Sequence, residues 1–186
     1  MTRTFIFCIS LLLSGCLVSL QPLSSAATAT TDPQLYGVWV AHEEGENLVY
    51  LHVGPDAKGM TQGMWVEYSS DSEFKVTNYT AFPTQVGELK LLNVVSQEDA
   101  VQPKGYDIVL YQIEDNDTLS FSAMSEDVVK QDIRSGKLKG KLKPGSIGDT
   151  IITASSSELR AYIEASDPAK LFRKPLVFHR APDPAD

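Results

Sequence analysis

Apolar and polar residues alternate along most of the chain from residue 34 to residue 124. Successive side chains of a β-strand point to opposite faces, so a period of two is typical of strands. Turn-forming Gly, Pro, Asp, Asn and Ser interrupt the alternation about every ten residues. Strands at this spacing are typical of an antiparallel sandwich or an up-and-down barrel, so we expect a mainly β domain. The seven expected strands are residues 35–42, 47–53, 60–69, 73–82, 89–95, 106–113 and 118–124.

The last third of the chain changes to a helical pattern. Residues 125–135 begin with a serine that can cap a helix and carry two acidic residues in the first turn. Ser155 and Glu158 have the spacing of a capping box, and an apolar helical face follows them. We therefore expect two short helices in the C-terminal third, then a closing strand at residues 175–180.

The first 15 residues have the composition of an export signal. Arg3 precedes an apolar run at residues 5–13. This run is too short to span a bilayer, for which about 20 residues are needed. We expect residues 1–15 to be a signal peptide, so the protein is expected to be exported.

The residues after this run allow two processing routes. Leu13-Ser14-Gly15-Cys16 resembles a bacterial lipobox, and the resemblance implies that Cys16 is lipidated and anchors the protein to a membrane. Leu17, rather than aspartate, follows the cysteine; by resemblance to enterobacterial lipoproteins this favours the outer membrane, facing the periplasm. The alternative is ordinary cleavage near Ala27, with a signal of residues 1–27 and a soluble periplasmic or secreted product.

The rest of the chain divides into three parts. Residues 16–33 are rich in Ser, Ala and Thr, the composition of a flexible tether. Residues 34–180 are expected to form a single β-rich domain, a length that suits one hydrophobic core. Residues 181–186 form a tail interrupted by prolines.

Charge and cysteine content exclude several functions. The 24 acidic residues all follow residue 31, where only 15 basic residues lie, so this part has a formal charge of −9. An acidic domain has no general affinity for nucleic acid, whose binding depends on phosphate contacts. Both cysteines, Cys8 and Cys16, belong to the signal region. The folded domain therefore has no thiol catalysis, disulfide or cysteine metal site.

A short motif at the start of the domain resembles the first motif of the lipocalins. Gln34, Leu35 and the Gly37-x-Trp39 pattern match it, and Thr77-Asn78-Tyr79 is similar to the second motif. The order of elements, a strand meander, a helix and a final strand, is also similar. The resemblance implies an eight-stranded antiparallel barrel that binds a small ligand inside.

The chain departs from that family at two positions. Val40 replaces the larger residue usual after the tryptophan, and the strand near residues 150–154 lacks the arginine that packs on the tryptophan in lipocalins. We expect Arg180 to take this role through a cation–π contact with Trp39. The helix at residues 125–135 has no place in the simple lipocalin pattern.

We find no motif for catalysis, a cofactor or a metal. The three histidines, His42, His52 and His179, are expected to be ordinary strand residues rather than a zinc site. The chain has no G-x-S-x-G elbow and no phosphate-binding glycine loop. We therefore expect a protein that is not an enzyme and carries no cofactor.

An eight-stranded barrel is just wide enough for side chains to fill it. We expect at most a shallow apolar pocket near one mouth, with Trp39, Tyr68, Asn93 and Tyr111 as its candidate contacts. The side chains expected to point inward are Leu35, Trp39, Val49, Leu51, Val53, Met64, Val66, Tyr68, Leu89, Leu91, Val95, Ile108, Leu110, Leu119 and Phe121.

Four lysines alternate with smaller residues near the C-terminal third: Lys137, Lys139, Lys141 and Lys143. On a strand they would share one face. One interpretation is a site for anionic groups or a partner protein. The favoured alternative is a charged edge strand that resists aggregation.

These observations favour an exported binding module for a small apolar or amphipathic ligand. The alternative is an interaction or inhibitor protein that docks on another envelope protein. Neither function involves nucleic acid.

Overall fold

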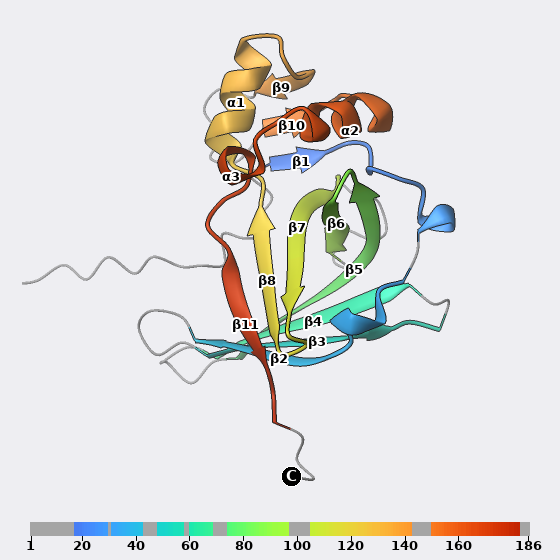
Figure 1. The fold of residues 1–186 in the computed structure, drawn as a ribbon, viewed down its shortest axis with the longest axis vertical. Coiled ribbons are helices and arrows are strands. Elements are labelled where there is room, and N and C mark those ends of the chain that lie inside the picture. Colours follow the sequence, from blue (N-terminus) through green and yellow to red (C-terminus); the bar gives the residue numbers. More distant parts are fainter. Residues whose placement is uncertain are drawn as a thin grey trace, which may run out of the picture.

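The structure, a computed structural model, describes residues 17–182 except 30, 43–47, 58–59, 69–73, 97–104 and 143–149. Its centre is a closed barrel of antiparallel strands in the order β11-β2-β3-β4-β5-β6-β7-β8 (Figure 1). This confirms the mainly β prediction and decides for the barrel over the sandwich. The strands are β2 (Gly37–His42), β3 (Leu48–Pro55), β4 (Thr61–Tyr68), β5 (Phe74–Val86), β6 (Leu89–Ser96), β7 (Asp107–Glu114), β8 (Thr118–Ala123) and β11 (Leu176–Arg180).

The strand β5 runs further than its sequence predicts. We expected it to end before Pro83, but it continues to Val86. Its neighbour β4 pairs with it only as far as Ala81, so beyond this point β6 is the only strand that pairs with β5 among the described residues. Proline lacks the N–H group of a ladder bond and is tolerated in such edge positions.

A small second layer covers one side of the barrel (Figure 1). It contains the three-stranded sheet β1-β10-β9, in which β1 runs parallel to β10 and β9 antiparallel to it. Three helices complete this layer, which we call the cap. Its elements are β1 (Leu17–Ser19), α1 (Glu126–Arg134), β9 (Gly140–Leu142), β10 (Thr150–Ile152), α2 (Ser156–Glu164) and α3 (Pro168–Leu171).

Both predicted helices are present. The capping box of α2 is complete: Ser155 Oγ accepts from Glu158 N at 3.3 Å, and Glu158 Oε2 accepts from Ser155 N at 2.9 Å. Ser125 precedes α1 but makes no side-chain cap bond. The additional short helix α3 begins at Pro168 after Asp167, whose carboxylate accepts from Ala169 N.

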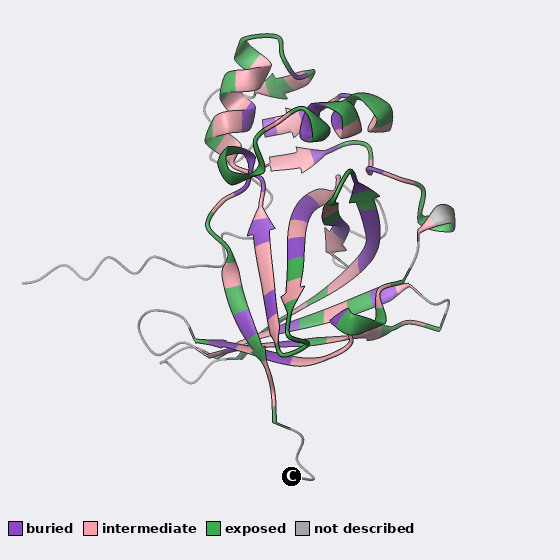
Figure 2. Cartoon of the chain, in the orientation of Figure 1, coloured by how far each residue is buried: buried purple, intermediate pink, exposed green. Residues whose placement is uncertain are grey.

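Two separate cores stabilise this arrangement (Figure 2). One fills the barrel, with Leu35, Trp39, Val49, Leu51, Trp65, Leu92, Val94, Val109, Tyr111, Leu119 and Phe178 among its members. The other lies between the cap and the strands, with Leu23, Leu91, Ile108, Val129, Leu138, Ile152, Leu159, Ile163 and Phe172 among its members. Strands β6 and β7 contribute to both cores, so they are apolar on both faces.

The segment at residues 17–29 packs against the domain, although its composition predicts a tether. Its first residues form β1, and the Leu23 side chain is 1% exposed. Leu23 N donates to Asn93 Oδ1 at 2.6 Å, and the hydroxyls of Ser24 and Thr84 lie 2.6 Å apart. The described part of this segment therefore belongs to the folded unit. A 3₁₀ turn, η2 (Ala26–Thr28), and a second, η3 (Pro33–Leu35), connect it to β2.

Candidate ligand-binding cavity in the barrel

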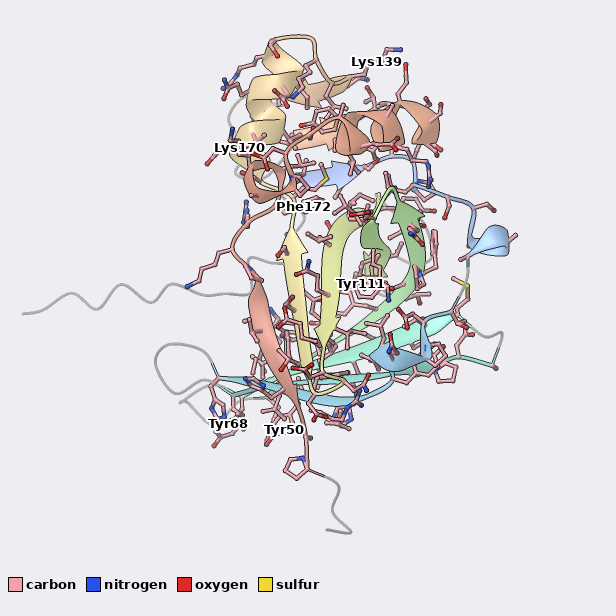
Figure 3. All side chains as sticks on the ribbon, in the orientation of Figure 1. Tyr50, Tyr68, Tyr111, Lys139, Lys170 and Phe172 are labelled. Atoms are coloured by element: carbon pink, nitrogen blue, oxygen red, sulfur yellow. The ribbon has the colours of Figure 1, made fainter. Side chains whose placement is uncertain are left out.

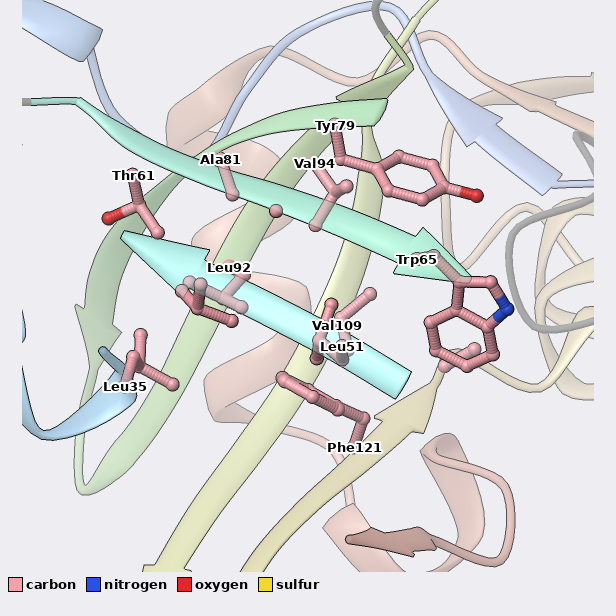
Figure 4. Close-up of a pocket in the computed structure, with 13 residues that line it drawn as sticks. Leu35, Leu51, Thr61, Trp65, Tyr79, Ala81, Leu92, Val94, Val109 and Phe121 are labelled. Atoms are coloured by element: carbon pink, nitrogen blue, oxygen red, sulfur yellow. The ribbon is translucent and has the colours of Figure 1, made fainter. Parts of the chain in front are cut away.

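An apolar cavity lies inside the barrel and is lined by residues of strands β3 to β8 and by Leu35 of η3 (Figure 4). The space open to the centre of a water-sized sphere is about 80 Å³. A single water needs roughly 10–15 Å³ of this measure, so there is room for several. The lining residues are Leu35, Leu51, Val53, Thr61, Gly63, Trp65, Tyr79, Ala81, Leu92, Val94, Val109, Phe121 and Ala123.

Carbon atoms form nearly all of the cavity surface. None of the lining residues within the described chain is charged. The indole N–H of Trp65 donates to Glu67 Oε1 at 2.8 Å and is therefore already paired. The buried hydroxyl of Thr61 has no hydrogen-bond partner among the described residues. In Figure 4 this hydroxyl points away from the other labelled side chains, so the lining offers a ligand hydrophobic contacts rather than hydrogen bonds.

Two of the aromatic rings that line the cavity, Trp65 and Phe121, pack against the buried ring of Phe178. The rings of Trp65 and Phe178 meet edge-to-face, with centroids 5.6 Å apart. Phe121 makes a similar contact with Phe178 at 5.8 Å. Such contacts are favoured by the ring quadrupoles and fix the ring orientations. Trp65 and Phe121 therefore present rigid surfaces to the cavity.

The end of the barrel near η3 is closed. Trp39 is fully buried there, and its indole N–H donates to the carbonyl of Leu35 at 2.8 Å. The guanidinium carbon of Arg180 lies 4.1 Å from the centroid of the Trp39 ring, so the predicted cation–π contact is confirmed. Arg180 also donates to the carbonyls of Tyr36 and Asn116, at 3.0 and 2.9 Å.

The same end contains a polar cluster around Asp32. The Tyr111 hydroxyl donates to Asp32 Oδ2 at 2.9 Å, and Lys90 Nζ donates to the same oxygen at 3.1 Å. Burial alone would raise the pKa of Asp32, but the hydrogen bonds from Tyr111, Lys90 and the backbone of Gln34 outweigh it and lower the pKa. Burial, together with the adjacent carboxylate, raises the pKa of Tyr111. This cluster ties η3 to β6 and β7.

None of the four predicted pocket residues lines the cavity. Trp39 and Tyr111 are inside the barrel, but they belong to its closed end. Tyr68 is 38% exposed on the outer surface. Asn93 is buried on the outside of β6, where its amide nitrogen donates to Thr84 Oγ1 and to the carbonyl of Phe82. Its role is to hold Leu23 rather than a ligand.

The error comes from the face assigned to three strands. In β4 the inward residues are Thr61, Gly63 and Trp65, whereas Met64, Val66 and Tyr68 were expected there. In β6 and β7 the inward residues are Leu92, Val94, Val109 and Tyr111. Four residues expected to be inward pack in the cap core instead: Leu89, Leu91, Ile108 and Leu110. Alternation alone cannot choose between two apolar faces. The sequence did offer a signal for the cavity: in β4 a tryptophan shares one face with a glycine and a threonine. Small residues beside a large ring leave space inside a barrel.

The lysine segment is not a continuous strand face. Of its described residues, 137–142, only 140–142 form a strand, and this strand lies at the edge of its sheet, as the edge-strand interpretation predicts. Lys137 pairs with Asp132 at 3.1 Å, and Lys139 pairs with Glu158. The hydrogen bond from Lys139, helped by Ser155, lowers the pKa of Glu158 to about 2. Lys141 is exposed, and Lys143 lies outside the described residues. Two of the four ammonium groups are thus engaged by carboxylates.

The three histidines lie on exposed outer positions of β2, β3 and β11. Within the described ranges, no group of three His, Cys, Asp or Glu side chains is arranged to hold a metal ion. No helix of the described chain is long and apolar enough to cross a membrane. Cys16 lies outside the described residues, next to the first residue of β1.

No protein-family model matches the chain, and comparisons with curated proteins and with solved structures returned no match.

Proposed function

We propose that this protein is a binding module that holds a small apolar ligand, or the apolar end of an amphipathic one, inside its barrel. The observation that carries the proposal is the cavity of about 80 Å³ lined almost wholly by carbon. A concave apolar surface releases its poorly hydrogen-bonded water when a hydrophobic ligand binds, which favours binding. The proposal assigns no catalysis and no cofactor to the chain.

The size of the cavity limits the ligand. Space for a few water-sized spheres suits a single ring or a short branched chain, but not a long acyl chain. The closed end at Trp39 and Arg180 also prevents a long chain from passing through the barrel. A polar group on the ligand would have to remain outside the cavity, because burying it among these carbons would leave it without a hydrogen bond.

We further propose that the module is an outer-membrane lipoprotein anchored through Cys16. In support, β1 begins at Leu17, and Leu23 is buried in the cap. Cleavage after Ala27 would remove both from the mature protein, whereas cleavage before Cys16 would retain every described residue. The anchor would then attach directly to the cap without an intervening tether.

Calorimetric titration of the mature chain with toluene tests the ligand proposal. We expect a dissociation constant between about 10 µM and 1 mM, the range open to so small a ligand. A long-chain fatty acid should bind at least ten times more weakly. Failure of toluene to bind at 1 mM, or tight stoichiometric binding of the fatty acid, would contradict the proposed ligand class.

Two glycine substitutions supply a matched pair for this titration. A Cβ at Gly63, which lines the cavity, would contact Leu51 at 3.6 Å, so Gly63→Val should fit and fill part of the space. A Cβ at Gly54, on the neighbouring strand, would meet nothing within 4 Å. Gly63→Val should weaken toluene binding at least tenfold, and Gly54→Val should leave it unchanged. Equal effects of the two would place the ligand elsewhere.

A further inference from the structure

One wall of the barrel is left uncovered by the cap. It consists of the outer faces of β11, β2, β3, β4 and the first half of β5, and we call it the bare wall. In Figure 3 Tyr50 and Tyr68 lie on this side of the molecule, far from Lys139 in the cap. Large apolar side chains are exposed there: Met64 (37%), Tyr68 (38%), Phe74 (70%), Val76 (47%) and Val177 (42%). Of the exposed large apolar residues in the described chain, Leu20 alone lies elsewhere.

The strand register joins four of these residues, Met64, Tyr68, Phe74 and Val76, into one surface. Adjacent residues form three rows across the wall, and neighbouring strands are about 4.8 Å apart. The rings of Tyr68 and Phe74 also contact each other, with centroids 5.1 Å apart. The rows are Val40-Tyr50-Val66-Val76, Val38-His52-Met64-Asn78 and His42-Leu48-Tyr68-Phe74.

In the described parts of β2 to β5, the three rows of the wall lack acidic residues, lysine and arginine. The charged residues of this region, Glu67 and Lys75, have the opposite parity and pair with each other in the register. The part of the chain after residue 31 otherwise has a net charge of −9. Tyr, Phe and Met in an uncharged patch are typical of the centre of a protein interface.

We infer that the bare wall binds a second copy of this chain in a twofold-symmetric dimer. Two copies of an acidic protein repel each other wherever their carboxylates meet, and this wall lets them meet without facing charges. A twofold contact uses the same patch on both copies, so the uncharged surface is complementary to itself. The inference does not depend on the ligand in the barrel.

The size and shape of the wall agree with this partner. Five strands by about six residues give a flat footprint near 500 Å² from ordinary strand spacings. Side chains project from this flat footprint and raise its accessible area. The area is then close to the roughly 600–800 Å² that each partner contributes to the smaller stable interfaces. Two sheet faces of this kind pack about 10 Å apart, as in a β-sandwich. A lipid surface is a poorer match, since it attracts Lys and Arg, which the three rows lack.

Cysteine cross-linking tests the dimer in cells that express the full chain. The described residues contain no cysteine, so an added one reports on its own position. Met64→Cys places a thiol on the wall, and Gln131→Cys places one on an exposed position of α1 as the matched control. Both variants retain Cys8 and Cys16 and therefore share any background from them. With a short bismaleimide, Met64→Cys should give a product of twice the chain mass at ten times the yield of Gln131→Cys or more.

A charge introduced on the wall supplies the second measurement. Phe74 is 70% exposed, so Phe74→Glu should fold, and it brings two carboxylates into the dimer. Combined with Met64→Cys, it should lower the cross-linking yield at least tenfold, while Gln131→Glu should not. Equal yields from Met64→Cys and Gln131→Cys, or a yield that Phe74→Glu leaves unchanged, would overturn the inference. A product containing a different protein would also overturn it.

Discussion

The guanidinium of Arg180 lies over the ring of Trp39, 4.1 Å from its centroid, and joins the last strand of the barrel to the first. The two residues are far apart in the sequence, and their contact completes the closed end. The arginine is held in place by the carbonyls of Tyr36 and Asn116, so it both stacks and donates hydrogen bonds. This pair and the adjacent 3₁₀ turn fix how the chain enters and leaves the barrel.

A double-mutant cycle should detect this contact. Trp39→Ala should cost about 3–5 kcal/mol of the free energy of unfolding, because the ring is fully buried. Arg180→Ala should cost about 2–3 kcal/mol through its lost hydrogen bonds. The double variant should be more stable than additivity predicts, by about 1–2 kcal/mol. Urea denaturation followed by circular dichroism measures all three, and a coupling energy near zero would show that the contact is energetically unimportant.

The glycine beside this pair is required for two reasons. Gly37 has φ = 139°, a conformation that L side chains rarely adopt, and a Cβ there would collide with Nη1 of Arg180. Gly37→Ala should therefore cost about 2 kcal/mol or more. Gly54→Ala, which meets nothing within 4 Å, is the matched control and should change stability by less than about 1 kcal/mol. Similar losses in both would mean that the local backbone adapts easily.

The sequence predicted the barrel well because its signals are local. Alternation and turn residues identify each strand, and a capping box identifies α2. The stacking of Arg180 on Trp39 could also be predicted, since the barrel must close near both residues. The inward faces of β4, β6 and β7 could not be predicted, because both faces of these strands are apolar and the choice depends on which outer face another part of the protein covers. The cap covers the outer side of β6 and β7, whereas the outer side of β4 belongs to the bare wall.

The cavity was harder to predict for the same reason. Its lining includes small residues, Gly63 and Ala81, whose importance appears only when the opposing strands are in place. The N-terminal segment shows a different limit. A composition rich in Ser, Ala and Thr predicted a tether, but one apolar residue, Leu23, reaches a buried site and a hydrogen bond from its own backbone holds it to Asn93.

Leu23 therefore provides a test of the N-terminal segment. Leu23→Ala should cost about 2–4 kcal/mol, since the side chain is 1% exposed within the cap core. Leu20→Ala, at a residue that is 46% exposed, is the control and should cost less than about 1 kcal/mol. The measurement is denaturant unfolding of the mature chain. If Leu23→Ala leaves the free energy of unfolding unchanged, the segment is a tether that does not contribute to the fold.

Acid should weaken the closed end through Asp32. Its pKa in the folded protein is lower than the 3.8 of an unperturbed aspartate, so the folded state favours the charged form. The resulting stabilisation is complete above pH 3.8 and is lost as the pH falls through the folded pKa. The stability difference between the native protein and Asp32→Asn should therefore be constant at neutral pH and shrink in strong acid. A difference that already grows as the pH falls towards 3.8, and is constant below it, would show that the folded pKa is raised instead.

The unpaired hydroxyl of Thr61 should make the protein less stable than it could be. Thr61 is 3% exposed, and its Oγ1 has no partner among the described residues. A buried hydroxyl without a hydrogen bond costs about 1–3 kcal/mol, and valine has nearly the same shape without the polar atom. Thr61→Val should therefore stabilise the protein by about 1 kcal/mol, raising its melting temperature by a few degrees.

Thr84→Val is the control with the opposite expected sign. Thr84 Oγ1 accepts a hydrogen bond from Asn93 Nδ2 at 2.8 Å, so this substitution should destabilise the protein by a similar amount. If Thr61→Val instead destabilises as much as Thr84→Val, the hydroxyl has a partner in solution, and a ligand in the cavity could then be sought near it.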